Sequence, residues 1–466
     1  MSYNAVIAAV STPPGKGGVA VIRMSGDGAL KIADRVFISA GGKRLSELAP
    51  RVQAYGYLMD GDVLIDDVMA VRFIAPFSYT GEETVEISAH GGTLITRSVL
   101  ELLFRYGAAP AAPGEFTRRA FINGKLTLTD AEAIGNLLDA RTDTQLALFR
   151  SDSRKRLNES VENIRSLLVD TLSSMLARID YPEEDLGDFT DEELLERLAA
   201  AKEMLGGLIA TYRTGKAISE GISTVLCGKP NVGKSSVYNA ILGEDAAIVT
   251  AVAGTTRDVL EHTASLGRVM LRLYDTAGIH ESEDMDEVEK IGVSRSLKRI
   301  DGAELIIAVF DLSRELDGED RAIIKRLSDI KTAKIALLNK SDLEKETSPV
   351  FDKTELDGIF DAVLTVSASR SEELKACLCG AVEKLFTDEK INPSSDAIVA
   401  SARQHGALMR AYDFLNLAHG ALSGGFLQDA VASDIERALG AISECDGISV
   451  SEEVVSDIFS KFCVGK

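Results

Sequence analysis

The sequence predicts a multidomain fold that combines α/β and all-α parts, and three observations support this prediction. The chain has 466 residues, about three times the length of an ordinary domain. Along the chain, short apolar runs give way to helical spacing, then to strands alternating with helices, and again to helical spacing. Hydrophobic residues make up 45% of the chain and charged residues 26%, which is the composition of a folded protein and excludes a disordered one.

The first part, residues 1–120, is predicted to be β-rich. Short apolar runs broken by Gly, Pro and Asp are typical of strands joined by turns. One helix is expected at Leu94–Tyr106. The apolar runs expected to form strands are Ala5–Val10, Val19–Met24, Val63–Phe73 and Thr84–Ser88.

Residues 121–220 and 391–466 are expected to form two segments of one helical domain. Leucine and isoleucine recur at three- and four-residue steps after Asp130, which we expect to cap the first helix. The acidic run Tyr181–Asp185 is interpreted as a solvated connection between helices. The part between the two segments, residues 221–390, would then be an insertion into the helical domain.

The inserted part is predicted to contain a mostly parallel sheet. Its apolar runs alternate with helical patterns, which favours βαβ units. The five expected strands are Ile222–Cys227, Val269–Tyr274, Leu305–Phe310, Lys334–Leu338 and Ala362–Val366.

A phosphate-binding loop is predicted directly after the first of these strands. Gly228–Ser235 has the pattern G-x-x-x-x-G-K-S between a strand and a helix, the context that this motif requires. Glycines let backbone N–H groups surround phosphate oxygens, and the helix N-terminus adds positive potential. Lys234 is expected to reach the β- and γ-phosphates, and Ser235 to ligate Mg²⁺. The nucleotide contacts predicted in this loop are Asn231, Val232, Gly233, Lys234, Ser235 and Ser236.

Later motifs predict that the nucleotide is GTP. Asp342, in the segment N-K-S-D, can accept hydrogen bonds from N1–H and the 2-amino group of guanine. Adenine offers neither donor, so ATP would leave this carboxylate unpaired. A backbone N–H in Ser367–Ser369 can meet guanine O6, Asp275 can support Mg²⁺, and Thr256 can be a second Mg²⁺ ligand. The further GTP contacts predicted are Thr250, Thr255, Thr256, Asp275, Thr276, Ala277, Gly278, Asn339, Lys340, Asp342, Ser367, Ala368 and Ser369.

One position departs from the pattern of Ras-like enzymes. After Asp-x-x-Gly these enzymes carry a glutamine that orients the attacking water. Here the position is Ile279, which cannot orient water. Hydrolysis therefore requires a group from elsewhere, and the acidic segment Glu281–Glu289 offers candidates.

Together with the C-terminal sequence F-C-V-G-K, these motifs resemble the MnmE (TrmE) family of GTPases, which modify tRNA uridine. The resemblance covers the whole chain. It implies a β-rich, folate-binding N-terminal domain, a helical domain and an inserted Ras-like P-loop GTPase domain. Other segments that match the family are Thr12–Gly18, Tyr79–Glu83, His90–Gly92, Pro113–Phe116 and Asp286–Gly292.

The resemblance also implies a reaction and partners. Proteins of this family are homodimers and form a heterotetramer with the FAD-dependent partner MnmG (GidA). Together they install an aminomethyl or carboxymethylaminomethyl group on the wobble uridine of tRNA. The one-carbon unit would come from a tetrahydrofolate derivative, in the 5-formyl or the 5,10-methylene form. The family implies K⁺-dependent GTPase activity when two G domains meet. A cytoplasmic protein without a membrane anchor is expected from the sequence itself, because no apolar run reaches the length of a membrane span and Met1–Val10 lacks the pattern of a signal peptide.

Site residues follow from the same resemblance. Glu289 matches the catalytic glutamate that orients water, and this role fills the gap left by Ile279. The K⁺ ligands would be Asn231, Thr250, Val252 and Thr255. The folate ligands would be Arg23, Glu86, Lys125 and Lys466, since a carboxylate suits the donor edge of a pterin and cations suit glutamyl carboxylates.

Other interpretations stay open at this point. A regulatory or ribosome-assembly GTPase switch would carry the same nucleotide motifs. A net charge of −21, from 72 acidic and 51 basic residues, argues against general attraction to RNA or to anionic membranes. Binding of tRNA would therefore need a localised basic surface or the partner. His90 can support a turn or take part in function, and Cys463 can be a structural thiol or a nucleophile.

Overall fold

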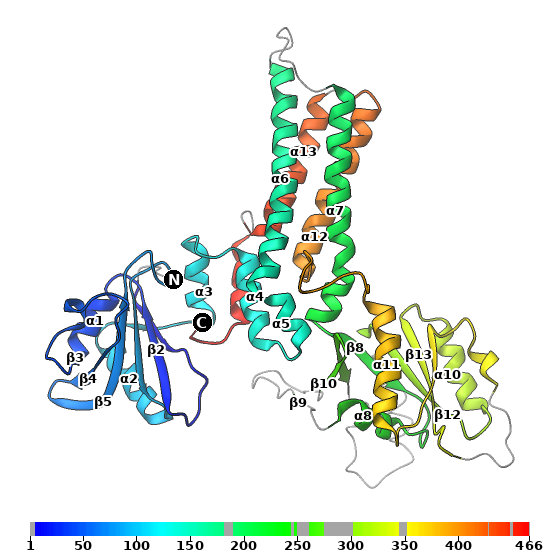
Figure 1. The fold of residues 1–466 in the computed structure, drawn as a ribbon, viewed down its shortest axis with the longest axis horizontal. Coiled ribbons are helices and arrows are strands. Elements are labelled where there is room, and N and C mark those ends of the chain that lie inside the picture. The colour runs from blue at the N-terminus through cyan, green and yellow to red at the C-terminus, as the bar shows by residue number, and fades with distance from the viewer. Residues whose placement is uncertain are drawn as a thin grey trace. The chain divides into compact units, whose positions relative to one another are not determined.

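A computed structural model describes residues 5–180, 190–243, 247–248, 261–274, 302–343, 352–426, 428–447 and 451–465. The chain divides into two compact units. The first combines residues 1–138 with residues 440–466, and the second comprises residues 139–439. Figure 1 shows the fold of each unit.

The first unit contains a seven-stranded sheet, which confirms the predicted β-rich N-terminal part. Its strand order is β3-β4-β5-β6-β2-β1-β7, and all neighbours are antiparallel except β1 and β7. The strands are β1 (Ile7–Val10), β2 (Val19–Ser25), β3 (Phe37–Ser39), β4 (Ala54–Asp60), β5 (Val63–Phe73), β6 (Thr84–His90) and β7 (Ala109–Pro110).

Helices cover both faces of this sheet. Successive side chains of β1 point to opposite faces of the sheet. Ala8 belongs to the core under α1 and α2, whereas Ile7 packs with Phe116 of α3 on the opposite face. The helices of this unit are α1 (Ala29–Val36), α2 (Thr93–Arg105), α3 (Glu115–Ile122), α4 (Leu128–Asp139) and α14 (Glu452–Ser460).

The C-terminal tail returns to this sheet. Phe459 of α14 is buried in a cluster with Leu128. Farther along, Val464 forms an antiparallel bridge with Pro113. The backbone oxygen of Gly465 accepts a hydrogen bond of 2.9 Å from Ser11 Oγ. The two ends of the sequence are therefore held in one unit.

The helical part contains long helices on both sides of the inserted α/β part. Helices α7 and α12 pack on each other: the rings of Tyr212 and His405 stack at 4.0 Å, and Val399 N donates to Thr211 Oγ1 at 3.0 Å. The helices are α5 (Asp143–Phe149), α6 (Ser151–Asp180), α7 (Asp191–Ser219), α12 (Ala402–Ser423) and α13 (Gln428–Asp446). The predicted insertion between two helical segments is confirmed.

The expected cap of the first helix is wrong. Helix α4 begins at Leu128, two residues before Asp130. Thr127 takes the capping position, since its Oγ1 accepts from Asp130 N and the Asp130 carboxylate accepts from Thr127 N, each at 3.1 Å. Asp130 thus completes a reciprocal capping pair inside the first turn. The acidic run Tyr181–Asp185 lies outside the described residues.

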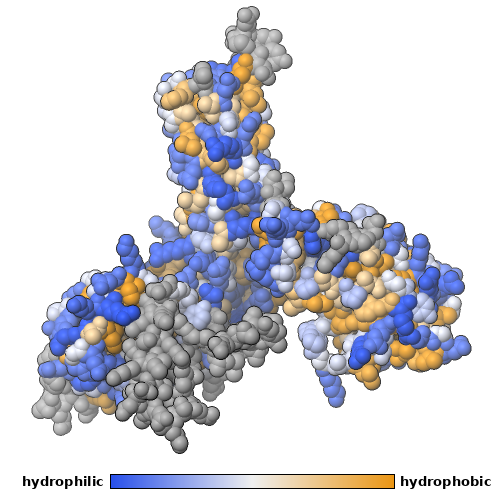
Figure 2. Space-filling view, turned by 180° about the vertical axis from the view of Figure 1, so that it is seen from behind, coloured by the Kyte–Doolittle hydropathy of each residue, from blue (hydrophilic) through white to orange (hydrophobic). Residues whose placement is uncertain are grey.

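The surface of the helical bundle mixes hydrophilic and hydrophobic residues (Figure 2). In the part of the chain that the structure describes, no helix combines the length and the apolar character needed to cross a membrane.

The second sheet is mostly parallel, as predicted. Its order is β14-β13-β12-β8-β11-β10-β9, and only the β11–β10 and β10–β9 pairs are antiparallel among its described strands. The strands are β8 (Ile222–Cys227), β9 (Ala247–Ile248), β10 (Glu261–Leu266), β11 (Val269–Tyr274), β12 (Leu305–Asp311), β13 (Ala333–Asn339) and β14 (Ala362–Thr365). The helices that accompany them are α8 (Lys234–Leu242), α10 (Gly318–Ser328) and α11 (Ser371–Phe386).

Candidate functional site

The predicted phosphate-binding loop connects β8 to α8. The strand ends at Cys227 and the helix begins at Lys234. Between them the backbone takes left-handed φ angles of 142° at Gly228, 63° at Asn231 and 95° at Gly233. Loops that combine such conformations with a helix N-terminus form concave anion sites lined by N–H groups. The local geometry is therefore suited to phosphate.

Two glycines of this loop also pack directly on the sheet. A Cβ atom at Gly228 would lie 2.4 Å from the Val309 carbonyl oxygen, and one at Gly233 would lie 2.3 Å from Asn339 Nδ2. Both separations are well below van der Waals contact. Glycine is therefore needed at these positions for close packing on β12 and β13, as well as for backbone conformation.

Asn339 joins the predicted phosphate-binding loop to the base-reading segments, the name used here for Asn339–Asp342 and Ser367–Ser369, which are predicted to recognise guanine. Its Nδ2 donates to the Val232 carbonyl at 2.9 Å, and its Oδ1 accepts from Ala368 N at 2.9 Å. The side chain is buried, with 2% of the residue exposed. Because parallel strands β8, β13 and β14 end at the same edge of the sheet, one amide side chain can connect segments far apart in the sequence.

Asp342 lies at the exposed edge of this arrangement with Ser367 and Ser369. Ser367 Oγ donates to Asp342 Oδ1 and lies 2.6 Å from Ser369 Oγ. Hydrogen bonds from Ser367, from the Asp342 backbone and from Ser369 lower the pKa of Asp342. The carboxylate is therefore ionised at neutral pH, as recognition of the two guanine donors requires.

The cationic and hydroxyl groups of the motifs lie around the same loop. Lys234 Nζ donates to the carbonyl oxygen of Lys229 at 2.6 Å, and Lys340 Nζ donates to that of Asn231 at 2.9 Å. The hydroxyl residues at the start of α8, Ser235 and Ser236, are exposed. A hydroxyl at the beginning of this helix is in the right place for a Mg²⁺ ion that bridges nucleotide phosphates.

Several predicted residues lie outside the described part of the chain. They are Thr250, Val252, Thr255, Thr256, Asp275, Thr276, Ala277, Gly278, Glu289 and Lys466.

Two of the predicted folate ligands are paired in the first unit. Arg23 and Glu86 face each other across β2 and β6, with Arg23 NH2 2.8 Å from Glu86 Oε1. The Arg23 guanidinium lies 5.1 Å from the ring centre of Tyr79 and 5.6 Å from that of Phe116. Lys125 Nζ donates to Pro76 O at 3.0 Å. A partly exposed ion pair beside aromatic rings fits a planar, polar heterocycle.

A cavity of about 640 Å³ lies elsewhere in the same unit. The loop Thr12–Gly17, helix α2 and Val464 line it, whereas Arg23, Glu86 and Lys125 do not. The predicted folate ligands and the cavity are therefore separate features.

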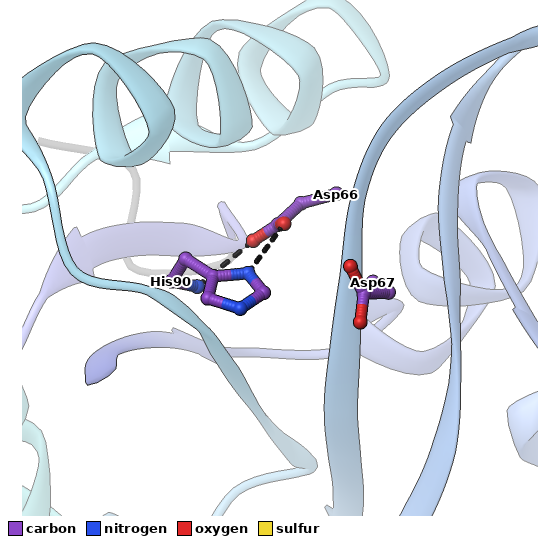
Figure 3. Close-up of side chains that lie close together, drawn as sticks. All are labelled: Asp66, Asp67 and His90. Atoms are coloured by element: carbon purple, nitrogen blue, oxygen red, sulfur yellow. Dashed lines mark hydrogen bonds and ion pairs between the residues drawn. The ribbon is translucent and has the colours of Figure 1, made fainter. Parts of the chain in front are cut away.

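His90, the last residue of β6, is hydrogen-bonded to Asp66 of the neighbouring strand β5 (Figure 3). Its backbone N and its Nδ1 each lie 2.8 Å from an Asp66 carboxylate oxygen. A hydrogen bond with Asp66 and the charges of Asp66 and Asp67 raise the pKa of His90. Because the pKa of His90 is higher in the folded state, its interaction with Asp66 contributes its full stabilisation at a pH below the unfolded pKa. This stabilisation is lost as the pH rises through the folded pKa. Gly91 N then donates to Gly18 O at 3.4 Å.

The comparisons with known families agree with this arrangement. The description "GTP-binding protein TrmE N-terminus" applies to the family model that matches residues 6–125, and "MnmE helical domain" to the one that matches residues 128–463. The chain belongs to the MnmE family of tRNA modification GTPases. The two models describe the N-terminal and helical parts of one family, and together they match most of the chain.

Full-length relatives named "tRNA modification GTPase MnmE" give the same answer. The relative from Latilactobacillus sakei is 40% identical over 464 residues, covering 99% of this chain and 98% of that protein. The one from Clostridioides difficile is 36% identical over 466 residues and covers both chains completely. The relative from Lactococcus lactis is 38% identical over 461 residues, covering 99% of this chain and 98% of that protein. The MnmE resemblance and the GTPase prediction are confirmed.

Proposed function

We propose that this protein hydrolyses GTP to drive modification of the wobble uridine of tRNA, in the cytoplasm, together with a FAD-dependent MnmG-type partner. The observation that supports this proposal most strongly is the match to MnmE relatives from end to end. In addition, Asn339 joins the predicted phosphate-binding loop to the segment predicted to meet guanine. The product would be 5-aminomethyl- or 5-carboxymethylaminomethyluridine. The domain boundaries that we propose are residues 1–120 for the N-terminal domain, 121–220 and 391–466 for the two segments of the helical domain, and 221–390 for the inserted GTPase domain.

Nucleoside analysis of tRNA tests the proposal directly. In cells that lack this protein, we expect the modified wobble uridine to disappear and to return when the gene is restored. Normal uridine modification combined with defective ribosome assembly would instead support the regulatory switch.

Because of the net charge of −21, the isolated protein should bind tRNA more weakly than its complex with the partner does. Filter-binding assays at fixed salt measure this difference.

For hydrolysis we propose that Glu289 orients the attacking water. Asn231, Thr250, Val252 and Thr255 would hold K⁺, which supplies positive charge near the phosphates when bound, while Ser235 and Thr256 would hold Mg²⁺. We expect Glu289→Ala to lower kcat about a hundredfold or more, because loss of a positioned proton acceptor has effects of that size. GDP affinity should stay unchanged in fluorescence titrations.

The matched control for this variant is Glu283→Ala, which removes a nearby acid of the same segment and should leave kcat within about twofold.

The rate of GTP hydrolysis by the unmodified protein should be much higher in K⁺ than in Na⁺. Equal rates in the two salts would remove the cation proposal, and a loss of GDP binding in Glu289→Ala would remove the catalytic role.

We also propose that the first unit binds a tetrahydrofolate derivative in a homodimer. Arg23 and Glu86 would contact the pterin, and Lys125 and Lys466 the glutamyl carboxylates. Calorimetric titration with 5-formyltetrahydrofolate should show that Glu86→Gln weakens binding about tenfold, because a charged hydrogen-bond acceptor is lost. Glu101→Gln, at an exposed ion pair on α2, should bind as the unmodified protein does. Equal affinity of all three proteins would contradict the assignment.

A further inference from the structure

The phosphate-binding loop is tied at two points to the connection between β12 and α10. Lys340 Nζ donates to the Asn231 carbonyl at 2.9 Å and to Asp311 Oδ2 at 2.7 Å. Lys229, two residues earlier in the loop, forms an ion pair with Asp317. Asp311 is the last residue of β12 and Asp317 caps α10, so the two acids lie at the two ends of the short connection between these elements.

Asp311 is buried and each of its carboxylate oxygens has a different partner. The residue is 8% exposed. Its Oδ1 accepts from Ser313 N at 3.0 Å and from Ser313 Oγ at 2.6 Å, whereas its Oδ2 accepts from Lys340. Burial opposes ionisation, but the hydrogen bonds from Lys340 and Ser313 outweigh it and lower the pKa of Asp311. Ser313 therefore orients an ionised carboxylate whose other oxygen meets Lys340.

Lys340 belongs to the base-reading segment Asn339–Asp342, and its side chain contacts the phosphate-binding loop. Its φ angle is 66°, a left-handed conformation that residues other than glycine rarely adopt. Its neighbour Asn339 contacts Val232 in the same loop. Asp311 thus contacts a lysine whose backbone belongs to the guanine site and whose side chain holds a carbonyl of the phosphate site.

We propose that Asp311 is a positioning residue for nucleotide binding, which acts through Lys340 to hold the Asn231 carbonyl and with it the phosphate-binding loop. Without the carboxylate, the Lys340 ammonium loses a buried anionic partner and its position over the Asn231 carbonyl is no longer enforced. Asp317 acts on the same loop through Lys229, but 48% of its side chain is exposed, so solvent screens this second contact.

The test is Asp311→Asn in the full-length protein, with GDP affinity and dissociation rate measured by a fluorescent GDP analogue. Asparagine keeps the shape and an acceptor for Ser313, but it removes the charge at Lys340. We expect GDP affinity to fall about ten- to a hundredfold, as for loss of a charged hydrogen bond. Asp317→Asn, which keeps a side-chain oxygen at the helix cap, should change affinity less than about threefold.

A double-mutant cycle separates positioning from general destabilisation. If Asp311 acts through Lys340, the double variant Asp311→Asn with Lys340→Met should bind GDP no more weakly than Lys340→Met alone. Thermal unfolding should show that all variants are folded at the assay temperature. Unchanged affinity in Asp311→Asn, or effects of the two substitutions that multiply, would overturn the proposal.

Discussion

Replacing Asp342 with asparagine is expected to weaken GTP and GDP binding by about a hundredfold to ten thousandfold. Without the carboxylate, the complex would lose two charge-assisted hydrogen bonds from N1–H and the 2-amino group of guanine, each worth about 1.5–3 kcal/mol. Ser367 Oγ can still donate to the remaining side-chain oxygen, so the local fold should persist. Titration with fluorescent GDP measures the loss.

Xanthosine diphosphate is the matched ligand for this variant. Xanthine carries a carbonyl where guanine carries its 2-amino group, and the asparagine amide can donate to that carbonyl. Asp342→Asn should therefore bind xanthosine diphosphate better than it binds GDP, whereas the unmodified protein should show the opposite order. The same preference for GDP in both proteins would mean that Asp342 does not read the base.

Replacing Gly233 with alanine is expected to reduce nucleotide binding by about a hundredfold or more. At a φ of 95° an alanine is strained, at a cost of about 1–2 kcal/mol. Its Cβ would lie 2.3 Å from Asn339 Nδ2. Asn339 would have to leave its hydrogen bonds to Val232 and Ala368, each worth about 1 kcal/mol. The loop would then lose both its conformation and its connection to the base-reading segment.

Gly207→Ala is the matched control, because it adds the same methyl group in the middle of α7 with nothing within 4 Å. It should leave GDP binding unchanged and should stabilise the protein by about 0.5–1 kcal/mol. Fluorescent GDP titration and thermal unfolding of both variants provide the comparison. Normal GDP affinity in Gly233→Ala would show that the loop adapts without the Asn339 bridge.

The nucleotide motifs were predictable because each is local. Gly228–Ser235 is a short contiguous pattern between an apolar strand and a helix, and its chemistry depends on residue type and spacing. The strands that carry the motifs were predictable for a related reason. A fully buried parallel strand such as β12 is apolar along almost its whole length, so it stands out as an uninterrupted run.

Elements with a weaker local signal were missed. Strand β10 has the sequence E-H-T-A-S-L, without a run of large apolar residues, and β9 has only two residues. Both depend on antiparallel pairing next to β11 for their formation. The start of α4 was misplaced because Thr127 and Asp130 are both good capping residues, and the choice between them depended on a reciprocal pair of hydrogen bonds.

Sequence alone was enough to predict the family, the nucleotide and the order of the domains, because these follow from short motifs and from the apolar period of each segment. Tertiary structure decided which residues meet. Asn339 reaches Val232 and Ala368, and Asp311 reaches Lys340, through strand order and register that bring distant segments to one sheet edge. Local propensities act over a few residues, whereas such contacts depend on how whole strands pack.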